Sequence, residues 1–331
     1  MTSVTFTYQT RLELSPEQAA LLGACAELYG MAERTLFARL CAGGEADKLK
    51  SEFCAAWGLT ARQYNAVSVG RKGKIDSVKE RRTGLLSELE HRILAAKKVL
   101  KKLSKPPRGE AAAARRVRRF KAHQKKRRLA TLESKHAAMA ADHKTGKARI
   151  AFGSKRLFRA QFALEANGYA GIDQWREEWR SARASQFLVL GSKDETAGCQ
   201  GCVATLAGDE TLTLRLRLPD SVVEGSPELT GKHALIEGVR FAYGHDNVVA
   251  ALNSYSATKV VGTTGKSEGK NVRKVSGTAL TYRFVRDEKG WRVFVAGRRP
   301  RAQRAPGSAP SAWTSTPTTS RWPRRTASAI W

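Results

Sequence analysis

The alternation of apolar and polar positions predicts a first strand and a late hairpin. In residues 5–14 the larger apolar side chains share one face and the polar ones the other, which is the period-two pattern of a strand. The same alternation marks residues 280–284 and 291–295, with a turn-like segment at 287–290 between them. We expect these two runs to pair as a β-hairpin and the first strand to find its partners elsewhere in the chain.

Apolar residues at helical spacing fill the next part of the chain. Ser15, Pro16 and Gln18 supply an N-cap, a first-turn proline and a capping-box partner, so a helix is predicted from there to about residue 42. A short helix follows at 49–57, and Thr60 opens another, which we expect Gly70 and Gly73 to interrupt. Two long helices, at 76–103 and 110–141, are separated by a break at 104–107 and predict a helical hairpin.

Beyond Gly146 the pattern shifts towards strands. A short apolar run occupies 148–152, a helix is predicted at 172–184, and strands at 186–190, 203–206, 211–218 and 233–243 precede the late hairpin. Many short antiparallel strands with Gly and Pro turns are typical of a small barrel or sandwich. The chain is therefore predicted to be α+β, with the helical region inserted between the first strand and the others.

Charge points to a polyanionic partner. The formal net charge is +29 and the pI about 10.4, which favours nucleic acid. Residues 97–128 carry fifteen Lys or Arg against one acid, Glu110. A phosphate backbone would relieve their repulsion; a solvated charged face is the alternative. The predicted phosphate contacts are Lys97, Lys98, Lys101, Lys102, Arg115, Arg116, Arg118, Arg119, Lys125, Lys126, Arg127 and Arg128.

Two further groups are candidates for nucleic-acid contacts. In residues 153–162 three cations, Lys155, Arg156 and Arg159, interleave with large apolar residues. At the start of the helix opened by Thr60, Arg62, Gln63 and Asn65 are weaker candidates for duplex recognition. Phosphate contacts position a nucleic acid without reading its bases, so these residues predict binding and no particular sequence specificity.

Catalytic and metal-binding patterns are not found. The pair Cys199 and Cys202 has half the spacing of a zinc site, but no second pair or nearby histidines complete it. His245 and Asp246 follow a glycine and are interpreted as a turn. We expect no metal, no cofactor and no catalytic residue in this chain. The odd number of cysteines and the absence of a signal core or a long apolar run predict a cytoplasmic protein without a membrane partner.

Several segments, in the same order, resemble the N-terminal half of TnpB-type proteins, which are insertion-sequence-encoded RNA-guided DNA nucleases. They are LSPEQAALL, FGSKRLFRAQF, GSKDETAGCQGC, TLTLRLRLPD and GWRVFV. The resemblance implies a wedge-like barrel, formed by residues 1–14 and 146–296 and interrupted by a helical recognition region at 15–145. It also implies a guide-type structured RNA, double-stranded DNA with a short target-adjacent motif, and a RuvC-like nuclease domain that would use a divalent metal such as Mg²⁺.

The composition of residues 297–331 departs from that family. They contain no Asp, Glu or Lys, but seven arginines, three tryptophans and five of the ten prolines, where the nuclease would open with a catalytic aspartate. The codons of Trp313 and Thr314 necessarily contain GAC in a shifted frame, which encodes aspartate. We therefore expect a disordered, frameshifted tail on a truncated chain that binds without cleaving. The alternatives are a stand-alone basic RNA-binding or regulatory protein, and an enzyme using dispersed carboxylates such as Asp173 and Asp246.

Overall fold

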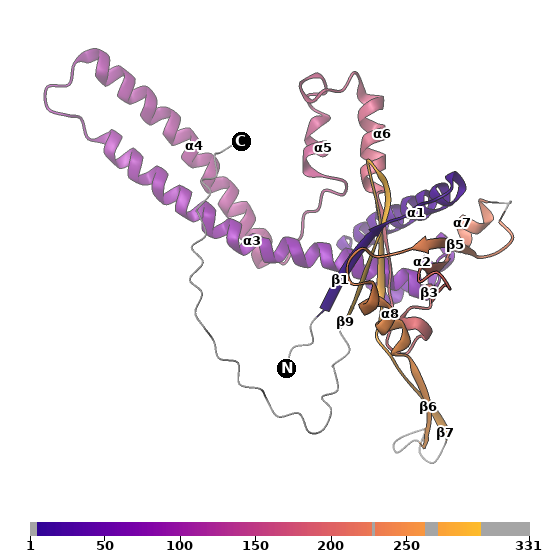
Figure 1. The fold of residues 1–331 in the computed structure, drawn as a ribbon. Coiled ribbons are helices and arrows are strands. Elements are labelled where there is room, and N and C mark those ends of the chain that lie inside the picture. Colours follow the sequence, from indigo (N-terminus) through magenta and orange to yellow (C-terminus); the bar gives the residue numbers. More distant parts are fainter. Residues whose placement is uncertain (1–4, 227–228, 262–270, 299–331) are drawn as a thin grey trace, which may run out of the picture. The chain divides into compact units, whose positions relative to one another are not determined.

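A computed structural model describes residues 5–226, 229–261 and 271–298 (Figure 1). They form an α+β protein with antiparallel sheets. The elements, in chain order, are β1 (Thr5–Arg11), α1 (Pro16–Cys41), α2 (Ala46–Trp57), α3 (Ala61–Ser104), α4 (Ala112–Lys144), α5 (Lys155–Ala160), α6 (Ile172–Arg183), β2 (Gln186–Val189), β3 (Cys202–Leu206), β4 (Leu212–Arg217), α7 (Asp220–Glu224), β5 (His233–Val239), α8 (His245–Asn253), β6 (Ser256–Val261), β7 (Asn271–Ser276), β8 (Thr281–Asp287) and β9 (Gly290–Arg298).

The described strands form three sheets, with orders β1-β9-β8-β2, β3-β4-β5 and β6-β7. The expected hairpin is confirmed, because β8 and β9 pair across a turn from Asp287 to Gly290. The first strand joins the same sheet, in register from Thr5 opposite Arg298 to Arg11 opposite Arg292. Helices α1 to α6 therefore lie, in sequence, between two strands that are neighbours in space.

No described sheet closes into a barrel. Closure of the four-stranded sheet would require its edge strands β1 and β2 to pair with each other. Among the described strands, β1 pairs only with β9, and β2 pairs only with β8. Helices α1 and α3 pack against β2 instead, and the Tyr29 ring of α1 lies 5.5 Å from the Phe187 ring of β2. The sequence pattern could not distinguish these helix contacts from strand closure, since both bury the same alternating face.

The main core lies between the sheets and the first three helices. The alternating residues Tyr282 and Phe284 of β8 are fully buried, as are Val293 and Val295 of β9. Phe284 stacks on Phe187 with ring centroids 4.8 Å apart. The inward faces predicted from alternation in these two strands are thus the ones that are buried.

Helix starts follow the predicted capping chemistry. The Gln18 backbone N–H donates to Ser15 Oγ at 3.2 Å, and the Ser15 N–H donates to Gln18 Oε1 at 2.8 Å, so both members of the capping box at α1 are formed. The Gln18 amide also donates to the carbonyl of Leu235 in β5. The cap therefore fixes α1 to the second sheet as well as starting the helix.

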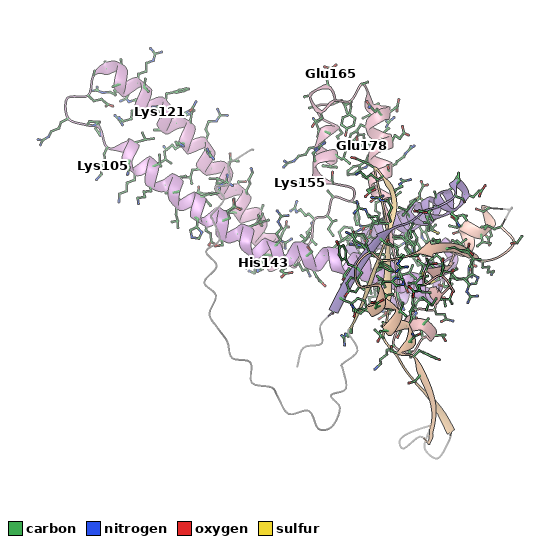
Figure 2. The ribbon with its side chains drawn as sticks, viewed as in Figure 1. Lys105, Lys121, His143, Lys155, Glu165 and Glu178 are labelled. Carbon is green, nitrogen blue, oxygen red and sulfur yellow. The ribbon has the colours of Figure 1, made fainter. Side chains whose placement is uncertain are left out.

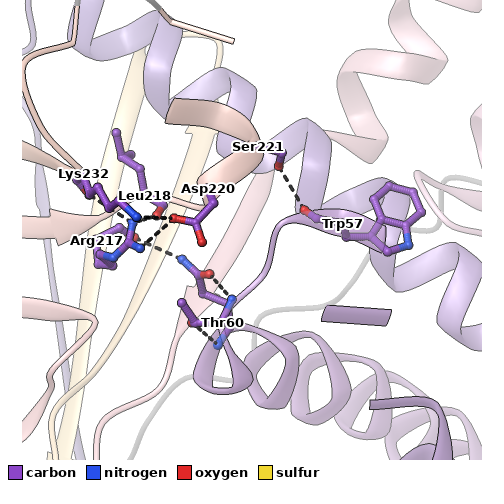
Figure 3. A network of polar contacts seen from close by, with 8 residues as sticks. Trp57, Thr60, Arg217, Leu218, Asp220, Ser221 and Lys232 are labelled. Carbon is purple, nitrogen blue, oxygen red and sulfur yellow. Dashed lines mark hydrogen bonds and ion pairs between the residues drawn. The ribbon is translucent and has the colours of Figure 1, made fainter. Parts of the chain in front are cut away.

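A polar network holds the start of α3 against the end of β4 (Figure 3). Gln63 completes the capping box with Thr60 and donates its amide to the carbonyl of Arg217. Ser221 donates to the carbonyl of Trp57, and Arg217 pairs with Asp220 at 2.8 Å. The turn between α2 and α3 is therefore fixed by contacts with residues more than 150 positions away.

Three local predictions are wrong. Gly70 and Gly73 do not interrupt α3. A helical glycine costs only about 1 kcal/mol relative to alanine, and the packing of α3 on α1 offsets that cost. Both glycines line a pocket of about 600 Å³. Residues 148–152 form no strand.

His245 begins helix α8 and is not part of a turn. Gly244 is the N-cap of α8 and has a φ of 71°. A Cβ on Gly244 would lie 2.1 Å from the Tyr8 ring.

Residues near the end of the described chain extend the sheet. β9 continues through Gly297 and Arg298, two positions that composition assigned to the tail. The rest of the tail, residues 299–331, lies outside the described residues. Among the described helices, none combines the length and the apolar character needed to cross a membrane.

We expect Phe284→Ala to lower the free energy of unfolding by about 3–5 kcal/mol, because it empties a fully buried position and removes the stacking partner of Phe187. Urea unfolding followed by tryptophan fluorescence measures the change. Leu94→Ala is the control, since Leu94 is 65% exposed and should shift stability by only about 0.5 kcal/mol. Equal effects of the two changes would contradict this core.

Acid should selectively weaken the junction of β1 with the hairpin turn. Asp287 accepts two hydrogen bonds from Arg11, at 3.0 and 3.2 Å, and this pair chiefly holds the pKa of Asp287 well below its usual 3.8. The resulting stability is present above that usual pKa and is lost as pH falls towards the lowered one. The melting temperature of the wild type should therefore exceed that of Asp287→Asn by a constant margin above about pH 5, and by a shrinking margin below about pH 4.

The matched control for that comparison is Glu288→Gln. Glu288 is exposed in the same turn and makes no ion pair with any residue the structure describes. Its margin against the wild type should stay near zero across the same pH range. A margin for Asp287→Asn that does not change below pH 4 would contradict the role of Asp287.

Candidate nucleic-acid interface

Helices α3 and α4 pack as an antiparallel pair. Their shielded positions alternate in steps of four and three residues, which is the seam spacing of a coiled coil. The buried members are Leu89 and Leu132. The half-buried members are Ile93, Ala96, Leu100 and Leu103 on α3, and Ala122, Lys125, Leu129 and His136 on α4. Between residues 89 and 136, every other position of the two helices except Arg118 is exposed.

The predicted phosphate contacts lie on this helical pair. Four of them are on α3 and eight on α4, and all are exposed except Arg118 and Lys125. Figure 2 shows long side chains projecting along both helices, including that of Lys121 on α4, and at the turn after α3, where Lys105 lies. The structure therefore brings together the twelve cations that sequence reasoning grouped. Their spacing at i and i+4, as in Lys97 and Lys101, places like charges side by side, which is unfavourable unless counterions or phosphates intervene.

Three of the twelve are paired with acids. Lys97 lies 2.9 Å from Glu133, and Arg118 and Arg115 lie 2.8 and 4.0 Å from Glu110. The remaining cations have no acidic partner within the described residues. They are Lys98, Lys101, Lys102, Arg116, Arg119, Lys125, Lys126, Arg127 and Arg128.

Arg118 holds the turn of the helical pair. Its guanidinium donates to both carboxylate oxygens of Glu110, at 2.8 and 2.9 Å, and to the carbonyl of Leu103 at 2.6 Å. The hydrogen bond with Arg118 is the main reason why the pKa of Glu110 is lowered. Because Arg118 uses its donors within the protein, it is a weaker candidate for a phosphate contact than its exposed neighbours Arg116 and Arg119.

The base of the helical pair is fixed by a second arginine. Arg82 of α3 is buried and donates to the carbonyl of Asp142 in the last turn of α4 and to that of Lys147, just beyond α4. The Asp142 carboxylate accepts two hydrogen bonds from Arg149, at 2.6 and 3.1 Å. The helices are thus joined at both ends and along the seam, so the exposed cations occupy a rigid support.

The weaker candidates at the start of α3 are largely engaged. Gln63 is buried and bonded to the backbone, as described above, and Asn65 is half-buried. Arg62 pairs with the buried carboxylate of Glu195, which also accepts the backbone N–H of Gln200. The side chain of Arg62 remains 39% exposed beside this ion pair.

Arg62 and Gln63 line one side of a pocket of about 750 Å³ that also contains Arg215 and His233. Burial, then the nearby Arg215 and Arg217, lowers the pKa of His233. Sequence reasoning missed Arg215 and His233. The alternation in TLTLRLRLPD was the available signal, because it places the arginines opposite the buried leucines.

The third group lies on α5. Lys155, Arg156 and Arg159 are exposed there and make no ion pair within the described residues. Helix α5 packs against α6, and the labelled Lys155 and Glu178 mark these two helices in Figure 2. Their apolar residues form a cluster separate from the main core, so this group belongs to a small helical unit and not to a β-sheet.

The cysteine pair lies in the main core. Cys199 and Cys202 are buried and free, and burial raises the pKa of Cys199 to about 11. Protonated, buried thiols are poor nucleophiles. Within the described ranges, no group of three or more His, Cys, Asp or Glu is placed to hold a metal ion.

Comparison with protein-family models gives no match for this chain. Comparison with curated proteins gives no relative. The assignment of a function therefore depends on the charges and geometry described above.

Arg118→Ala should loosen the turn between α3 and α4, because it frees the buried side of Glu110 and the carbonyl of Leu103. We expect faster amide hydrogen exchange in residues 104–117 and easier proteolysis there. Arg116→Ala, at an exposed neighbouring position, removes the same charge and should leave exchange unchanged. Equal protection in the two variants would show that Arg118 does not hold the turn.

Proposed function

We propose that this chain binds nucleic acid by holding phosphates along the α3–α4 helical pair, as the nucleic-acid-binding part of a TnpB-type RNA-guided nuclease. The observation that carries the proposal is the set of nine cations without acidic partners among the described residues, on a support fixed at both ends. Its partners would be a guide-type structured RNA and double-stranded DNA. Binding of this kind needs no metal or cofactor from the chain.

The dimensions support phosphate binding. The cations of α4 from Arg115 to Arg128 cover about 20 Å of helix axis at about 1.5 Å per residue. Along the axis of a duplex each strand presents a phosphate about every 3.4 Å, so this length corresponds to about six base pairs, of which the phosphates on the facing side can be contacted. Several cations can therefore be neutralised together without bending either partner.

The TnpB-type assignment is supported by the order of the elements. A first strand, an inserted helical region that carries the charge, and later strands that pair with the first follow one another as the resemblance implies. The proposal includes a wedge-like role for the β1-β9-β8-β2 and β3-β4-β5 sheets. The pocket lined by Arg62, Arg215 and His233 is a candidate for contacts to bases, because phosphate contacts from the cations of the helical pair carry no sequence information.

A stand-alone basic RNA-binding protein is the second candidate, since unpaired cations would serve any RNA. The nucleotide sequence of the gene and its downstream region separates the two. A shifted frame that continues into an acidic nuclease motif favours the TnpB-type proposal. An intact frame through residues 299–331 with nothing nuclease-like downstream favours the stand-alone protein.

Salt titration of binding tests the role of the helical pair. On duplex DNA, log K should fall linearly with log salt, and removing one cation that neutralises a phosphate should reduce the slope by about 0.9, or by about 0.7 on single strands. The triple variant Lys98→Gln, Lys101→Gln, Lys102→Gln should therefore bind more weakly and with a shallower slope. Fluorescence anisotropy with a labelled duplex and a labelled hairpin RNA gives both quantities.

The control removes three charges from paired surface cations outside the helical pair. Arg39, Lys48 and Lys232 each form an ion pair with a neighbouring acid, and their replacement by glutamine changes the net charge equally. This control should retain most of the salt dependence. Equal weakening in both triple variants would reduce the interaction to net charge, and binding that ignores salt would overturn the proposal.

A further inference from the structure

Helices α5 and α6 form a small unit with a core of its own. Its buried residues are Leu157, Ala160, Tyr169 and Trp175, and the Trp175 indole donates to the carbonyl of Leu157 at 2.8 Å. The unit also carries the predicted contacts Lys155, Arg156 and Arg159. Phosphate binding alone does not account for the aromatic rings that lie beside these cations.

Aromatic rings continue from this core to the surface. Trp175 stacks on Trp179 at 5.7 Å, Trp179 lies 6.1 Å from Phe158, and Phe158 lies 6.2 Å from Phe162. Exposure rises along the series: Trp175 is 8% exposed, Phe158 47% and Phe162 77%. A phenylalanine has no polar atom to favour exposure, so two exposed phenylalanine rings in contact form an apolar surface that another flat ring can cover.

Charge around these rings is favourable for an anion. The unit holds four cations and four acids between residues 153 and 178 and two more cations up to residue 183, but Asp173 pairs with Arg176 and Glu178 bonds to Tyr169, whose pKa it raises. The cations of α5 have no such partner among the described residues. Arg183 already lies over the Trp179 ring at 4.9 Å, so the cluster accommodates guanidinium and aromatic groups together.

We propose that Phe158 and Phe162 are a stacking platform for unpaired bases of RNA, with Lys155, Arg156 and Arg159 holding the flanking phosphates. Exposed aromatic rings beside cations are the combination that binds single strands, because bases stack on the rings while the backbone follows the charge. A duplex hides the faces of its bases and cannot use the platform. The inference rests on the proposed nucleic-acid function and adds the single-stranded segment of the RNA as the ligand of this second site.

The test measures anisotropy of the full chain with labelled oligouridine of about 16 nucleotides, within known single-strand site sizes. Parallel probes are an abasic ribose-phosphate strand, the corresponding DNA strand, and a duplex of equal length. Phe162→Ala should weaken oligouridine binding about tenfold, the effect of losing one stacked base, and should leave the salt slope, the abasic strand and the duplex unchanged. Phe162→Tyr should restore binding to within about twofold, because the ring is kept.

Tyr243→Ala is the matched control, since Tyr243 is an aromatic residue 84% exposed outside this unit, and it should bind oligouridine like the wild type. Photocrosslinking of 4-thiouridine to the wild type is a measurement that does not depend on any variant folding; adducts within residues 157–163 support the platform. Equal oligouridine affinity of the wild type and Phe162→Ala, or adducts confined to α3 and α4, would overturn it. Tighter binding of the DNA strand than of oligouridine would overturn the choice of RNA.

The two proposals fail separately. If the Lys98, Lys101, Lys102 triple variant loses binding but Phe162→Ala does not, the platform is wrong and the proposed function stands. If only Phe162→Ala loses binding, the helical pair is not the phosphate site and the platform stands. If Phe162→Ala instead converts a dimer to a monomer in analytical ultracentrifugation without changing RNA affinity, the aromatic surface joins two copies of the chain and the inference is overturned.

Discussion

The pairing of β1 with β9 is the constraint on which the rest of this structure depends. It joins residues at the two ends of the described chain, and closing a loop of about 280 residues costs about 5 kcal/mol beyond a constant. The pair is specific as well as distant: Gly297 faces Phe6 so closely that a Cβ would lie 2.7 Å from its ring. The segments between β1 and β9 begin and end at this one strand pair. A change in the length of the inserted helices would therefore leave the pairing of β1 with β9 in place.

The two basic units relate differently to this sheet. Helix α3 begins at the network around Gln63 and the end of β4, so the long helical pair is anchored in the main core at its first turn. Helices α5 and α6 have a small cluster of their own; α6 leads directly into β2 and accepts a hydrogen bond at Ser181 from Arg286 of β8. The α3–α4 pair presents many cations and one exposed phenylalanine ring, Phe120, whereas the α5–α6 unit presents two exposed phenylalanine rings with fewer cations. Under the proposed function the two units would be complementary, since a structured RNA offers both continuous backbone and unpaired bases.

Sequence reasoning found the features that local rules determine. The capping boxes at Ser15 and Thr60, the alternation in β8 and β9, and the concentration of cations in residues 97–128 all appear where expected. It failed where tertiary contacts decide: the glycines of α3 are tolerated because neighbouring elements pack there, and β2 contacts helices instead of closing a barrel. At the site, composition could count Arg118 but could not reveal its bonds to Glu110. The exposure of Phe162 was likewise hidden, because an apolar residue beside a helix is usually buried.

The seam between α3 and α4 has a consequence for how such a protein can change over generations. Because its shielded positions recur every seven residues, one heptad could be deleted from each helix and the surviving side chains would keep their faces. Each such deletion would shorten the α3–α4 pair by about 10 Å, or about three base pairs of duplex. The contacts of Arg118 at the turn and of Arg82 at the base would remain. Under the proposed function, these fixed increments of length would let the α3–α4 pair be matched to nucleic acids of different size.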